Sequence, residues 1–513
     1  MPKKFYITTA IVYVNAKPHI GHAYEFITTD TIARYHRLIG DDVFFLTGSD
    51  EHSANVLRAA EARGMDAQPF CDEMVATYQD FAHSLSMSYD NFVRTTAENH
   101  HKTCEAIITR VHERGDIRKG KYEGWYCESC EAFYTDKDLV DGKCPTHHKE
   151  PRWLEEENYF FALSEYQERL EKLYAERPEF AEPEVRRNEL LSVIRSGLID
   201  FSTSRSTFEW GIPIPFDPGQ VIYVWFDALI NYLSGIGYAD DREKFEHYWP
   251  ADVHTIGKDI IRFHCIYWPA MLMSAGLPVP RKVFAHGFVN DNQGRKMSKS
   301  LGNVVEPLEQ IKKYGTDVLR YFLMREAPYG SDLRYSEKAL VNRYNAELAN
   351  DLGNLLGRSL AMVRKYRDCA VPARWTGDSC PVAAIPGFRE KMAESFRKYT
   401  SEMDNLALQS ALMATWDLIR AGNKFVDESE PWALSKDPAR KAELDAVLAE
   451  LVYALEAAAL LVLPFMPGAG ERMLEQLGRT QGEIRWEEGG IVSDPRRDDQ
   501  KVNPGPSLFP RIE

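Results

Sequence analysis

The chain has 513 residues, 44% of them hydrophobic and 27% charged, and a formal net charge of −15. This length exceeds what one hydrophobic core supports, so we expect two to four domains, and the composition is that of an ordinary globular protein, not of a disordered one. The most apolar helical run, residues 444–463, contains three acidic side chains and predicts a buried helix, not a membrane span. Because residues 1–5 lead into a strand pattern without a secretory signal, we expect a cytoplasmic protein with no membrane partner.

Strand and helix patterns alternate in the first part of the chain. Residues 5–13 are rich in β-branched and aromatic side chains, a helical pattern follows to about Leu38, and residues 42–48 are typical of a buried parallel strand. The buried-strand pattern returns at residues 253–257 and 282–287. We therefore predict an α/β fold in which a doubly wound parallel sheet is split by an insertion. Ligands of such sheets bind at the carboxyl ends of the strands.

Strand patterns almost vanish after about residue 340, where helical spacing dominates. This part of the chain is predicted to be an all-α helical bundle. The expected boundaries are 1–115 for the first half of the sheet domain, 116–215 for the insertion, 216–290 for the second half, 291–340 for a loop region and 341–513 for the bundle.

A first signature, His19-Ile20-Gly21-His22, lies between the predicted first strand and its helix. A helix N-terminus attracts phosphate, and two histidines three residues apart share a face from which both can donate to phosphate oxygens. Gly21 has no Cβ and leaves room for an adenine ring on the backbone. The alternative is that the two histidines only cap or pack the helix.

The insertion contains a metal-ligand pattern. Two short motifs separated by thirteen residues offer four ligands: Cys127, Cys130, Cys144 and His147. This pattern is typical of a tetrahedral zinc ribbon, and hairpin strands are expected at 122–126 and 132–135. His148 competes as the fourth ligand. A complete set of protein ligands makes the predicted zinc structural; the alternative is an insertion that folds without metal.

A second signature, Lys296-Met297-Ser298-Lys299-Ser300, follows a predicted turn at residues 292–294. Two cations and two hydroxyls behind a turn can form a mobile anion clamp, although a solvated loop has the same composition. Together, the two signatures resemble those of class I aminoacyl-tRNA synthetases. The resemblance implies a Rossmann-like catalytic domain that binds ATP with Mg²⁺ and an anticodon-binding helical bundle.

Other segments extend the resemblance over nearly the whole chain and narrow it to the methionyl-tRNA synthetases. These segments are residues 9–13, 48–52, 223–228 and 256–260, with His264 after the last of them. An insertion of about 100 residues is too short for both a connector and an editing domain, so the substrate should be one that binding alone discriminates. Cysteine and methionine are the candidates. A cysteine enzyme would want zinc at the substrate thiolate.

The resemblance assigns roles residue by residue. Catalysis falls to His19, His22, Lys296 and Lys299. Contacts with ATP fall to His19, Gly21, His22, Gly257, Asp259, Lys296, Met297, Ser298 and Lys299. Asp50 would hold the methionine ammonium with the backbone of Ile11, and the remaining pocket would consist of Tyr13, Trp225, Ala228, Leu229, Tyr232, Ile260 and His264. Aromatic rings suit a polarizable thioether, and Tyr232 or His264 could donate weakly to its sulfur. Core packing is the alternative for Trp225 and Tyr232.

The same resemblance assigns anticodon reading to Asn354, Arg358 and Trp432. Amide and guanidinium groups can hydrogen-bond unpaired base edges, and an indole can stack on a splayed base. Alternatively, Arg358 is an ordinary surface residue and Trp432 a hydrophobic contact at a helix end. Between residues 281 and 374 the chain carries 17 Lys or Arg against 10 Asp or Glu, a basic band that could meet the tRNA phosphates within an acidic chain.

Val14 and Ser53 depart from the family pattern, which more often has proline and glycine there. Since the chain stops at Glu513 without the extension that dimerizes some relatives, we expect a monomer. The expected partners are ATP, L-methionine and tRNA(Met). The alternatives are another class I synthetase, a related adenylate-forming nucleotidyltransferase without RNA, and an inactive synthetase-like RNA-binding protein.

Overall fold

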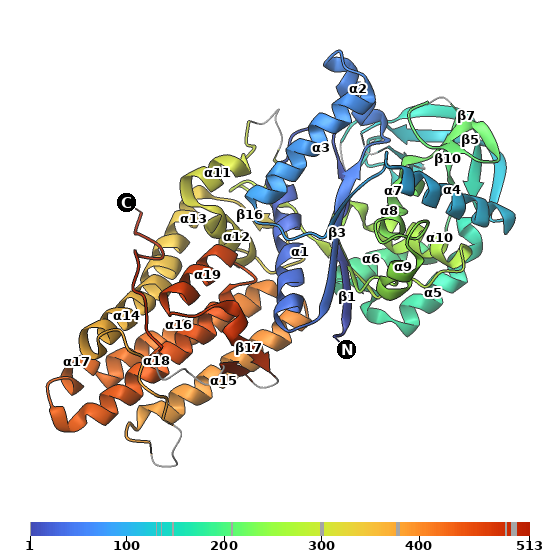
Figure 1. Ribbon diagram of the computed structural model, residues 1–513. Coiled ribbons are helices and arrows are strands. Elements are labelled where there is room, and N and C mark those ends of the chain that lie inside the picture. Colours follow the sequence, from blue (N-terminus) through green and yellow to red (C-terminus); the bar gives the residue numbers. More distant parts are fainter. Residues whose placement is uncertain are drawn as a thin grey trace. The chain divides into compact units, whose positions relative to one another are not determined.

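The computed structural model describes residues 2–129, 131–134, 136–145, 148–206, 209–297, 302–375, 380–487, 490–493 and 500–512 (Figure 1). The chain divides into two compact units. Unit 1 comprises residues 1–29, 42–83 and 87–288, and unit 2 comprises residues 30–41, 84–86 and 289–513. The division falls within helix α1 (Ile20–Leu38), whose first half belongs to unit 1 and whose second half belongs to unit 2.

A seven-stranded sheet forms the centre of unit 1, and the strand pairs recorded for it are parallel. Its strands are β1 (Lys4–Thr8), β2 (Val12–Tyr13), β3 (Asp42–Asp50), β4 (Asn91–Arg94), β8 (Ala181–Glu182), β13 (Val253–Gly257) and β14 (Lys282–His286). The order is β2-β3-β1-β13-β14-β8, with β4 also paired to β3. The doubly wound α/β prediction is confirmed. The central strands are buried because helices cover the sheet, as their continuous hydrophobic runs predict.

The helices of unit 1 connect these strands. They are α2 (Ala54–Ala62), α3 (Ala67–Ser84), α4 (Glu98–Glu113), α5 (Gln167–Glu176), α6 (Glu184–Arg195), α7 (Val224–Leu229), α8 (Asn231–Ser234), α9 (Arg242–Tyr248) and α10 (Trp268–Ser274). Ser53 caps α2 by accepting a hydrogen bond from the backbone of Val56 at 3.1 Å. The serine that departs from the family pattern therefore has a structural use here.

The inserted segment forms an antiparallel sheet of its own. Its strands are β5 (Ile117–Cys127), β6 (Ala132–Tyr134), β7 (Arg152–Phe161) and β9 (Phe201–Ser202), in the order β6-β5-β7-β9. The β5–β6 pairing confirms the hairpin that was predicted around the cysteines. A second small sheet follows, with β10 (Ser204–Arg205), β11 (Pro213–Ile214) and β12 (Asp217–Ile222). The insertion also supplies β8, which pairs with β14 of the main sheet.

Unit 2 is mainly helical, as predicted. Its helices are α11 (Pro307–Tyr314), α12 (Thr316–Arg325), α13 (Glu337–Arg343), α14 (Asn354–Arg367), α15 (Ala384–Asp404), α16 (Leu408–Ser429), α17 (Pro431–Leu434), α18 (Lys441–Val462) and α19 (Pro467–Gln476). Two short strand pairs accompany them: β15 (Val289–Asn290) with β16 (Leu333–Arg334), and β17 (Ile484–Glu487) with β18 (Gly490–Ser493). The apolar run after residue 440 is α18, and most of its side chains are buried.

A buried ion pair anchors α12 within unit 2. Arg320 and Asp30 are both fully buried, and their charged groups lie 2.8 Å apart. The guanidinium also donates to the backbone carbonyls of Leu85, Pro464 and Phe465. These interactions join α12 to the second half of α1 and to the end of α18. Loss of any charged partner would leave a buried charge unpaired, which is strongly destabilising.

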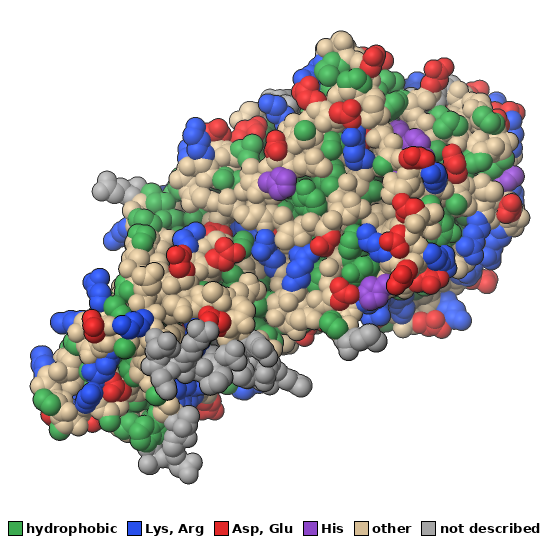
Figure 2. Space-filling model, viewed as in Figure 1, with side chains coloured by type: hydrophobic (Ala, Val, Ile, Leu, Met, Phe, Trp, Pro, Cys, Tyr) green, Lys and Arg blue, Asp and Glu red, His purple; other side chains and the backbone are tan. Residues whose placement is uncertain are grey.

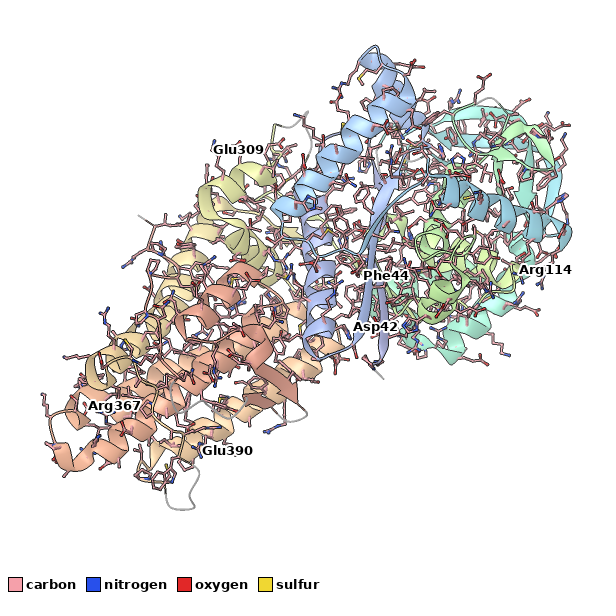
Figure 3. All side chains as sticks on the ribbon, in the orientation of Figure 1. Asp42, Phe44, Arg114, Glu309, Arg367 and Glu390 are labelled. Atoms are coloured by element: carbon pink, nitrogen blue, oxygen red, sulfur yellow. The ribbon has the colours of Figure 1, made fainter. Side chains whose placement is uncertain are left out.

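Acidic and basic side chains are interspersed on the face shown in Figure 2. Two of the residues labelled in Figure 3 contact a neighbouring element. Phe44 of β3 packs against the ring of Tyr248, with centroids 5.1 Å apart, and Arg367 in the last turn of α14 pairs with Asp445 of α18. Among the described residues, no helix has the length and apolar character needed to span a membrane.

Candidate active site

The two histidines of the first signature cap the start of α1. The Nδ1 atom of His19 accepts from the backbone N–H groups of Gly21 and His22, at 3.1 and 3.4 Å, and Nδ1 of His22 accepts from the N–H of His19 at 3.2 Å. The rings stack with centroids 3.8 Å apart. Because each Nδ1 accepts, the hydrogen of each neutral ring lies on Nε2. Capping and donation to a phosphate are therefore compatible.

Desolvation, and secondly the neighbouring His19, hold the pKa of His22 well below its usual value. The ring is therefore neutral at physiological pH, and it keeps the single Nε2–H donor. Gly21 is required by the stack itself, since a Cβ at this position would lie 2.9 Å from Cε1 of His19. At the end of β13, a Cβ on Gly257 would lie 2.7 Å from an oxygen of Asp259. Both glycines thus permit the close approach of a neighbouring polar side chain.

An aromatic cluster surrounds the start of α7. The indole of Trp225 stacks on the ring of Phe263 at a centroid distance of 3.7 Å and an angle of 3°. The ring of Tyr13 meets Trp225 edge-on at 6.4 Å. Phe263 begins a π-helical turn, Phe263–Tyr267, which is the kind of irregularity often found at functional sites. The sequence interpretation did not include Phe263, although its place in the segment between Ile260 and His264 could have indicated it.

Tyr232 and His264 form a hydrogen-bonded pair in the predicted methionine site. The Nδ1–H of His264 donates to the carbonyl of Ile260 at 3.0 Å, so Nε2 accepts from the hydroxyl of Tyr232 at 2.8 Å. Burial lowers the pKa of His264 to about 4, which keeps the ring neutral. Both hydrogens of this pair are therefore engaged within the protein. The expected weak donation from Tyr232 or His264 to a sulfur atom is not supported by this geometry.

Asp50 ends β3 with a buried carboxylate that is incompletely satisfied. It is 3% exposed, and among the residues that the structure describes its Oδ1 has no hydrogen-bond partner. The buried hydroxyl of Tyr13 likewise has none in the described part of the chain. Burial, followed by the charge of Asp227, raises the pKa of Asp50 well above its usual value. A buried carboxylate of this kind is suited to bind a cationic ligand, because the cation compensates the free-energy cost of burying the negative charge.

The rest of the predicted pocket lies on the same elements. Ala228 and Leu229 are buried in α7, Ile260 ends the turn after β13, and Ile11 lies between β1 and β2. Ile260 and Tyr13 both pack against the cluster that contains Trp225. The structure therefore brings together residues that are more than 200 positions apart in the sequence.

The predicted turn before the second signature is confirmed in unit 2. Asp291 accepts from the backbone N–H of Gln293 at 3.0 Å and from that of Arg295 at 2.8 Å, and Gly294 has a positive φ of 79°. The side-chain amide of Asn303 donates to Asp291 at 3.0 Å and so joins the two ends of the loop. Lys296 is exposed. Ser298 and Lys299 lie outside the described residues.

Comparison with known proteins assigns the family. Residues 5–152 and 138–360 match the model described as tRNA synthetases class I (M), and residues 384–495 match the anticodon binding domain of methionyl tRNA ligase. The chain belongs to the class I methionyl-tRNA synthetase family. A methionine–tRNA ligase of Caldanaerobacter subterraneus subsp. tengcongensis is 46% identical over 100% of this chain and 80% of its own length. One from Brucella suis is 47% identical over 93% and 92% of the two chains.

A solved structure agrees with the sequence relatives. The methionyl-tRNA synthetase of Mycobacterium tuberculosis in complex with methionyl-adenylate is 42% identical, with a TM-score of 0.94 over 99% of this chain and 100% of that one. This agreement favours the methionyl family over another class I synthetase and over a nucleotidyltransferase without an anticodon domain.

Two of the predicted zinc ligands of this synthetase are described, and both are buried. Cys127 ends β5, and the sulfur of Cys144 lies 3.6 Å from the hydroxyl of Tyr134. Cys130 and His147 lie outside the described residues. The next residues, Glu131 and His148, have positive φ values of 50° and 53°, so each motif is followed by a left-handed residue that ends its turn. Buried thiols on such turns fit a structural zinc.

The predicted anticodon readers of the synthetase lie on unit 2. Asn354 and Arg358 are one turn apart on α14, as expected, and Asn354 is exposed. Arg358 pairs with Asp427 near the end of α16 at 2.8 Å. Trp432, on the short helix α17 that follows, is 38% exposed, which is unusual for so large an apolar side chain.

Proposed function

We propose that this synthetase forms methionyl-adenylate from methionine and Mg-ATP and then transfers the methionyl group to the 3′-terminal adenosine of tRNA(Met). A carboxylate oxygen of methionine attacks the α-phosphorus of ATP, and pyrophosphate leaves. A ribose hydroxyl of the tRNA then attacks the acyl carbon, and AMP leaves. Because the substrate carboxylate is the nucleophile, the protein supplies alignment and charge stabilisation.

The observation that carries this proposal is the carboxylate of Asp50 beside the aromatic cluster. A buried oxygen without a partner in the described part of the chain, with its pKa raised, costs stability unless a cation compensates it. The methionine ammonium supplies that cation. The thioether end lies against Tyr13 and Trp225, since aromatic rings attract polarizable sulfur. Ile11, Ala228, Leu229, Tyr232, Ile260 and His264 complete the methionine site.

We assign contacts with ATP to residues of each signature. His19 and His22 donate through Nε2–H to phosphate oxygens, and Gly21 contributes by leaving room for the His19 ring of this pair. Gly257 and Asp259 contact the nucleotide from the end of β13. Lys296 and Lys299 stabilise the negative charge that develops on the leaving pyrophosphate, and the loop residues Met297 and Ser298 also contact ATP. Mg²⁺ enters with the ATP phosphates.

We assign one structural zinc to Cys127, Cys130, Cys144 and His147, with His148 as the competing fourth ligand. Burial of Cys127 and Cys144 supports a closed set of ligands. The anticodon is read by Asn354, Arg358 and Trp432. The exposure of Trp432 supports this role, since a stacking platform must be accessible. The synthetase acts as a cytoplasmic monomer.

The test is the variant Asp50→Asn. It removes the charge that pairs with the ammonium, so methionine-dependent ATP–pyrophosphate exchange should fall at least about tenfold in kcat/KM, the effect of losing one hydrogen bond to a charged group. Asp240→Asn changes an exposed carboxylate and serves as the control. Unchanged exchange in Asp50→Asn would show that another group binds the ammonium.

The same variant should be more stable. A carboxyl whose pKa is raised by folding destabilises the protein as the pH rises above its unfolded pKa of about 3.9. At neutral pH, Asp50→Asn removes this cost, so its melting temperature should exceed that of the wild type when methionine is absent. The difference should shrink when saturating methionine is added to both.

A further inference from the structure

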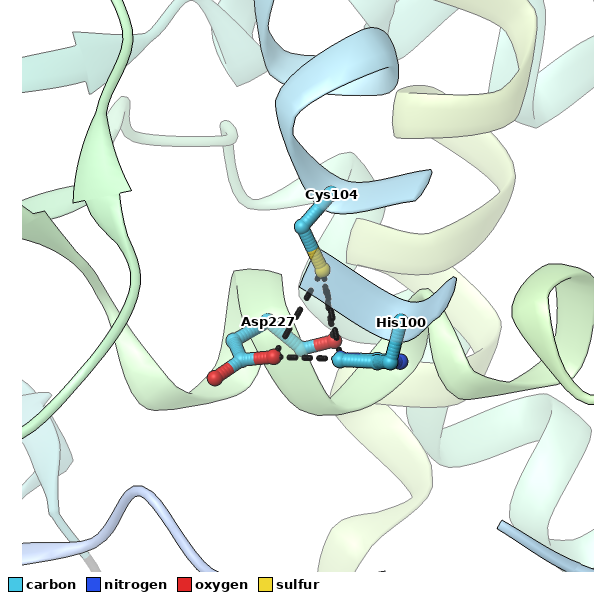
Figure 4. A group of neighbouring side chains, drawn as sticks. All are labelled: His100, Cys104 and Asp227. Carbon is cyan, nitrogen blue, oxygen red and sulfur yellow. Dashed lines mark hydrogen bonds and ion pairs between the residues drawn. The ribbon is translucent and has the colours of Figure 1, made fainter. Parts of the chain in front are cut away.

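A buried hydrogen-bond network lies behind the methionine pocket. The carboxylate of Asp227, on α7, is fully buried and accepts from two histidines. Its Oδ2 lies 2.7 Å from Nδ1 of His52, and its Oδ1 lies 2.6 Å from Nε2 of His100. The other ring nitrogen of His100 is 2.8 Å from the hydroxyl of Ser234. Figure 4 shows the sulfur of Cys104 beside this carboxylate and imidazole.

The network joins the two walls of the pocket. His52 follows Asp50 by two residues at the end of β3, and Asp227 follows Trp225 by two residues on α7. The hydrogen bond from His52 to Asp227 therefore connects the segment that holds the ammonium ligand to the helix that holds the aromatic wall. His100, on α4, hydrogen-bonds to the other carboxylate oxygen of Asp227. The carboxylate therefore cannot rotate freely.

The electrostatics agree with this geometry. Burial alone would raise the pKa of Asp227, but the charge of His52 and the hydrogen bond from His100 hold it below its usual value. The carboxylate therefore stays ionised, and its charge in turn raises the pKa of Asp50. The same network thus orients the loop that carries Asp50 and prepares the carboxylate of Asp50 for a cationic ligand.

The spacing of His100, Cys104 and Asp227 would also permit a metal ion. The short distances within this group are better explained by hydrogen bonds than by a metal site. The distance of 2.6 Å between Nε2 and Oδ1 is that of a direct N–H···O contact, so the imidazole hydrogen lies between the atoms that would ligate the metal. Burial, then Asp227, raises the pKa of the Cys104 thiol, so it remains protonated and is a poor ligand.

We propose that Asp227 is a positioning residue for methionine: through His52 it holds the Asp50 segment in register with Trp225, so that one ligand meets both. This inference rests on the assignment of Asp50 and Trp225 to the methionine site. None of the residues assigned to ATP belongs to this network, so ATP should bind normally when the network is broken.

The experiment measures KM for methionine and for ATP in pyrophosphate exchange by three single variants, one double variant and a control. Asp227→Asn places an amide N–H₂ against a histidine donor, and His52→Leu removes the donor to Asp227. His52→Asn keeps a donor at the position of Nδ1. Cys104→Ala removes a buried neighbour of the network without breaking either histidine bond, and it reports on general damage to the core.

Asp227→Asn and His52→Leu should each raise the KM for methionine by about tenfold or more, the effect of losing one buried hydrogen bond to a charge. The double variant Asp227→Asn/His52→Leu should be hardly worse than either single variant, because both break the same link. His52→Asn and Cys104→Ala should stay within about threefold of the wild type. The KM for ATP should change little in all of them.

A parallel rise of both KM values, or equal effects of His52→Asn and His52→Leu, would overturn the proposal. Loss of one zinc equivalent in Cys104→Ala would also overturn it, since the group would then be a metal site. If Asp227→Asn does not fold, the two His52 variants decide the question alone. Wild-type exchange with methionine and its loss in Asp50→Asn test the proposed function separately, so failure of the proposed function and failure of this inference are distinguishable.

Discussion

In the proposed methionine site, Asp50 and Trp225 are assigned to opposite ends of the substrate. The carboxylate of Asp50 is buried, and the indole of Trp225 is stacked on Phe263. We assign the carboxylate to the ammonium and the indole to the thioether. Neither residue is unusual alone: a buried aspartate is often salt-bridged, and a stacked tryptophan is often core. Their combination with an unsatisfied Oδ1 in the described part of the chain indicates a ligand site.

Trp225→Ala should raise the KM for methionine by roughly tenfold to a hundredfold, because it removes most of one apolar wall of the pocket. The KM for ATP should change little. Trp225→Phe keeps an aromatic face against Phe263 and should show a smaller effect. Exchange kinetics for the three proteins provide the check, and equal changes in both KM values would mean that Trp225 is only a core residue.

At the residue scale, the sequence predicted the parts of the site that lie in short motifs. His19, Gly21 and His22 could be found because four consecutive residues mark a helix start. The network of His52, His100 and Asp227 could not, because its members lie on three elements and have no local pattern. The engagement of the Tyr232 hydroxyl by His264 also depends on a side-chain orientation that only the fold determines.

The element that most needs testing is the cysteine-containing hairpin of β5 and β6. We expect the purified protein to contain about one zinc per chain, since the four proposed ligands form one site. Cys144→Ser should lose the metal, whereas Cys265→Ser, at a buried cysteine outside the hairpin, should keep it. Metal analysis of His147→Ala and His148→Ala identifies the fourth ligand. Stoichiometric zinc in the Cys127→Ser/Cys144→Ser variant would contradict this assignment.

Helices α14, α16 and α17 carry the predicted anticodon surface. Trp432→Ala should leave pyrophosphate exchange intact, since that step involves no tRNA. It should lower aminoacylation by roughly fivefold to a hundredfold, because one base stack is worth about 1–3 kcal/mol.

Arg358→Ala should also reduce discrimination between a CAU anticodon and its single-base variants. Asp427→Asn removes the ion-pair partner but keeps Arg358, so it should retain discrimination. Normal charging by both Trp432→Ala and Arg358→Ala would exclude this surface.

Long periodic elements were predictable, and short ones were not. The range of α1 agrees with the prediction, and α18 covers the predicted apolar run at 444–463 to within three residues at its start and one at its end, because many turns repeat the same pattern. The pairing of β8 with β14 was missed, since a strand of two residues has no periodicity. The β17–β18 pair and the π-helical segments were also missed.

At the scale of the whole molecule, the predicted sites are distributed over both units. Unit 1 contains the first signature, the predicted methionine pocket and the hairpin with the predicted zinc ligands, and unit 2 contains the lysine loop and the helices assigned to the anticodon. The order of patterns along the sequence predicted a parallel-sheet part followed by a helical part, because the sheet strands end before residue 290 and the helical spacing follows. The family match over both regions agrees with it.

The most direct test of the account is amino-acid-dependent ATP–pyrophosphate exchange across the twenty amino acids. The aromatic pocket and the carboxylate of Asp50 predict that methionine supports exchange far better than leucine, isoleucine or cysteine. Activity with methionine alone at physiological concentrations would agree with the account. Equal exchange with any of the other three amino acids, or no exchange with methionine, would contradict it.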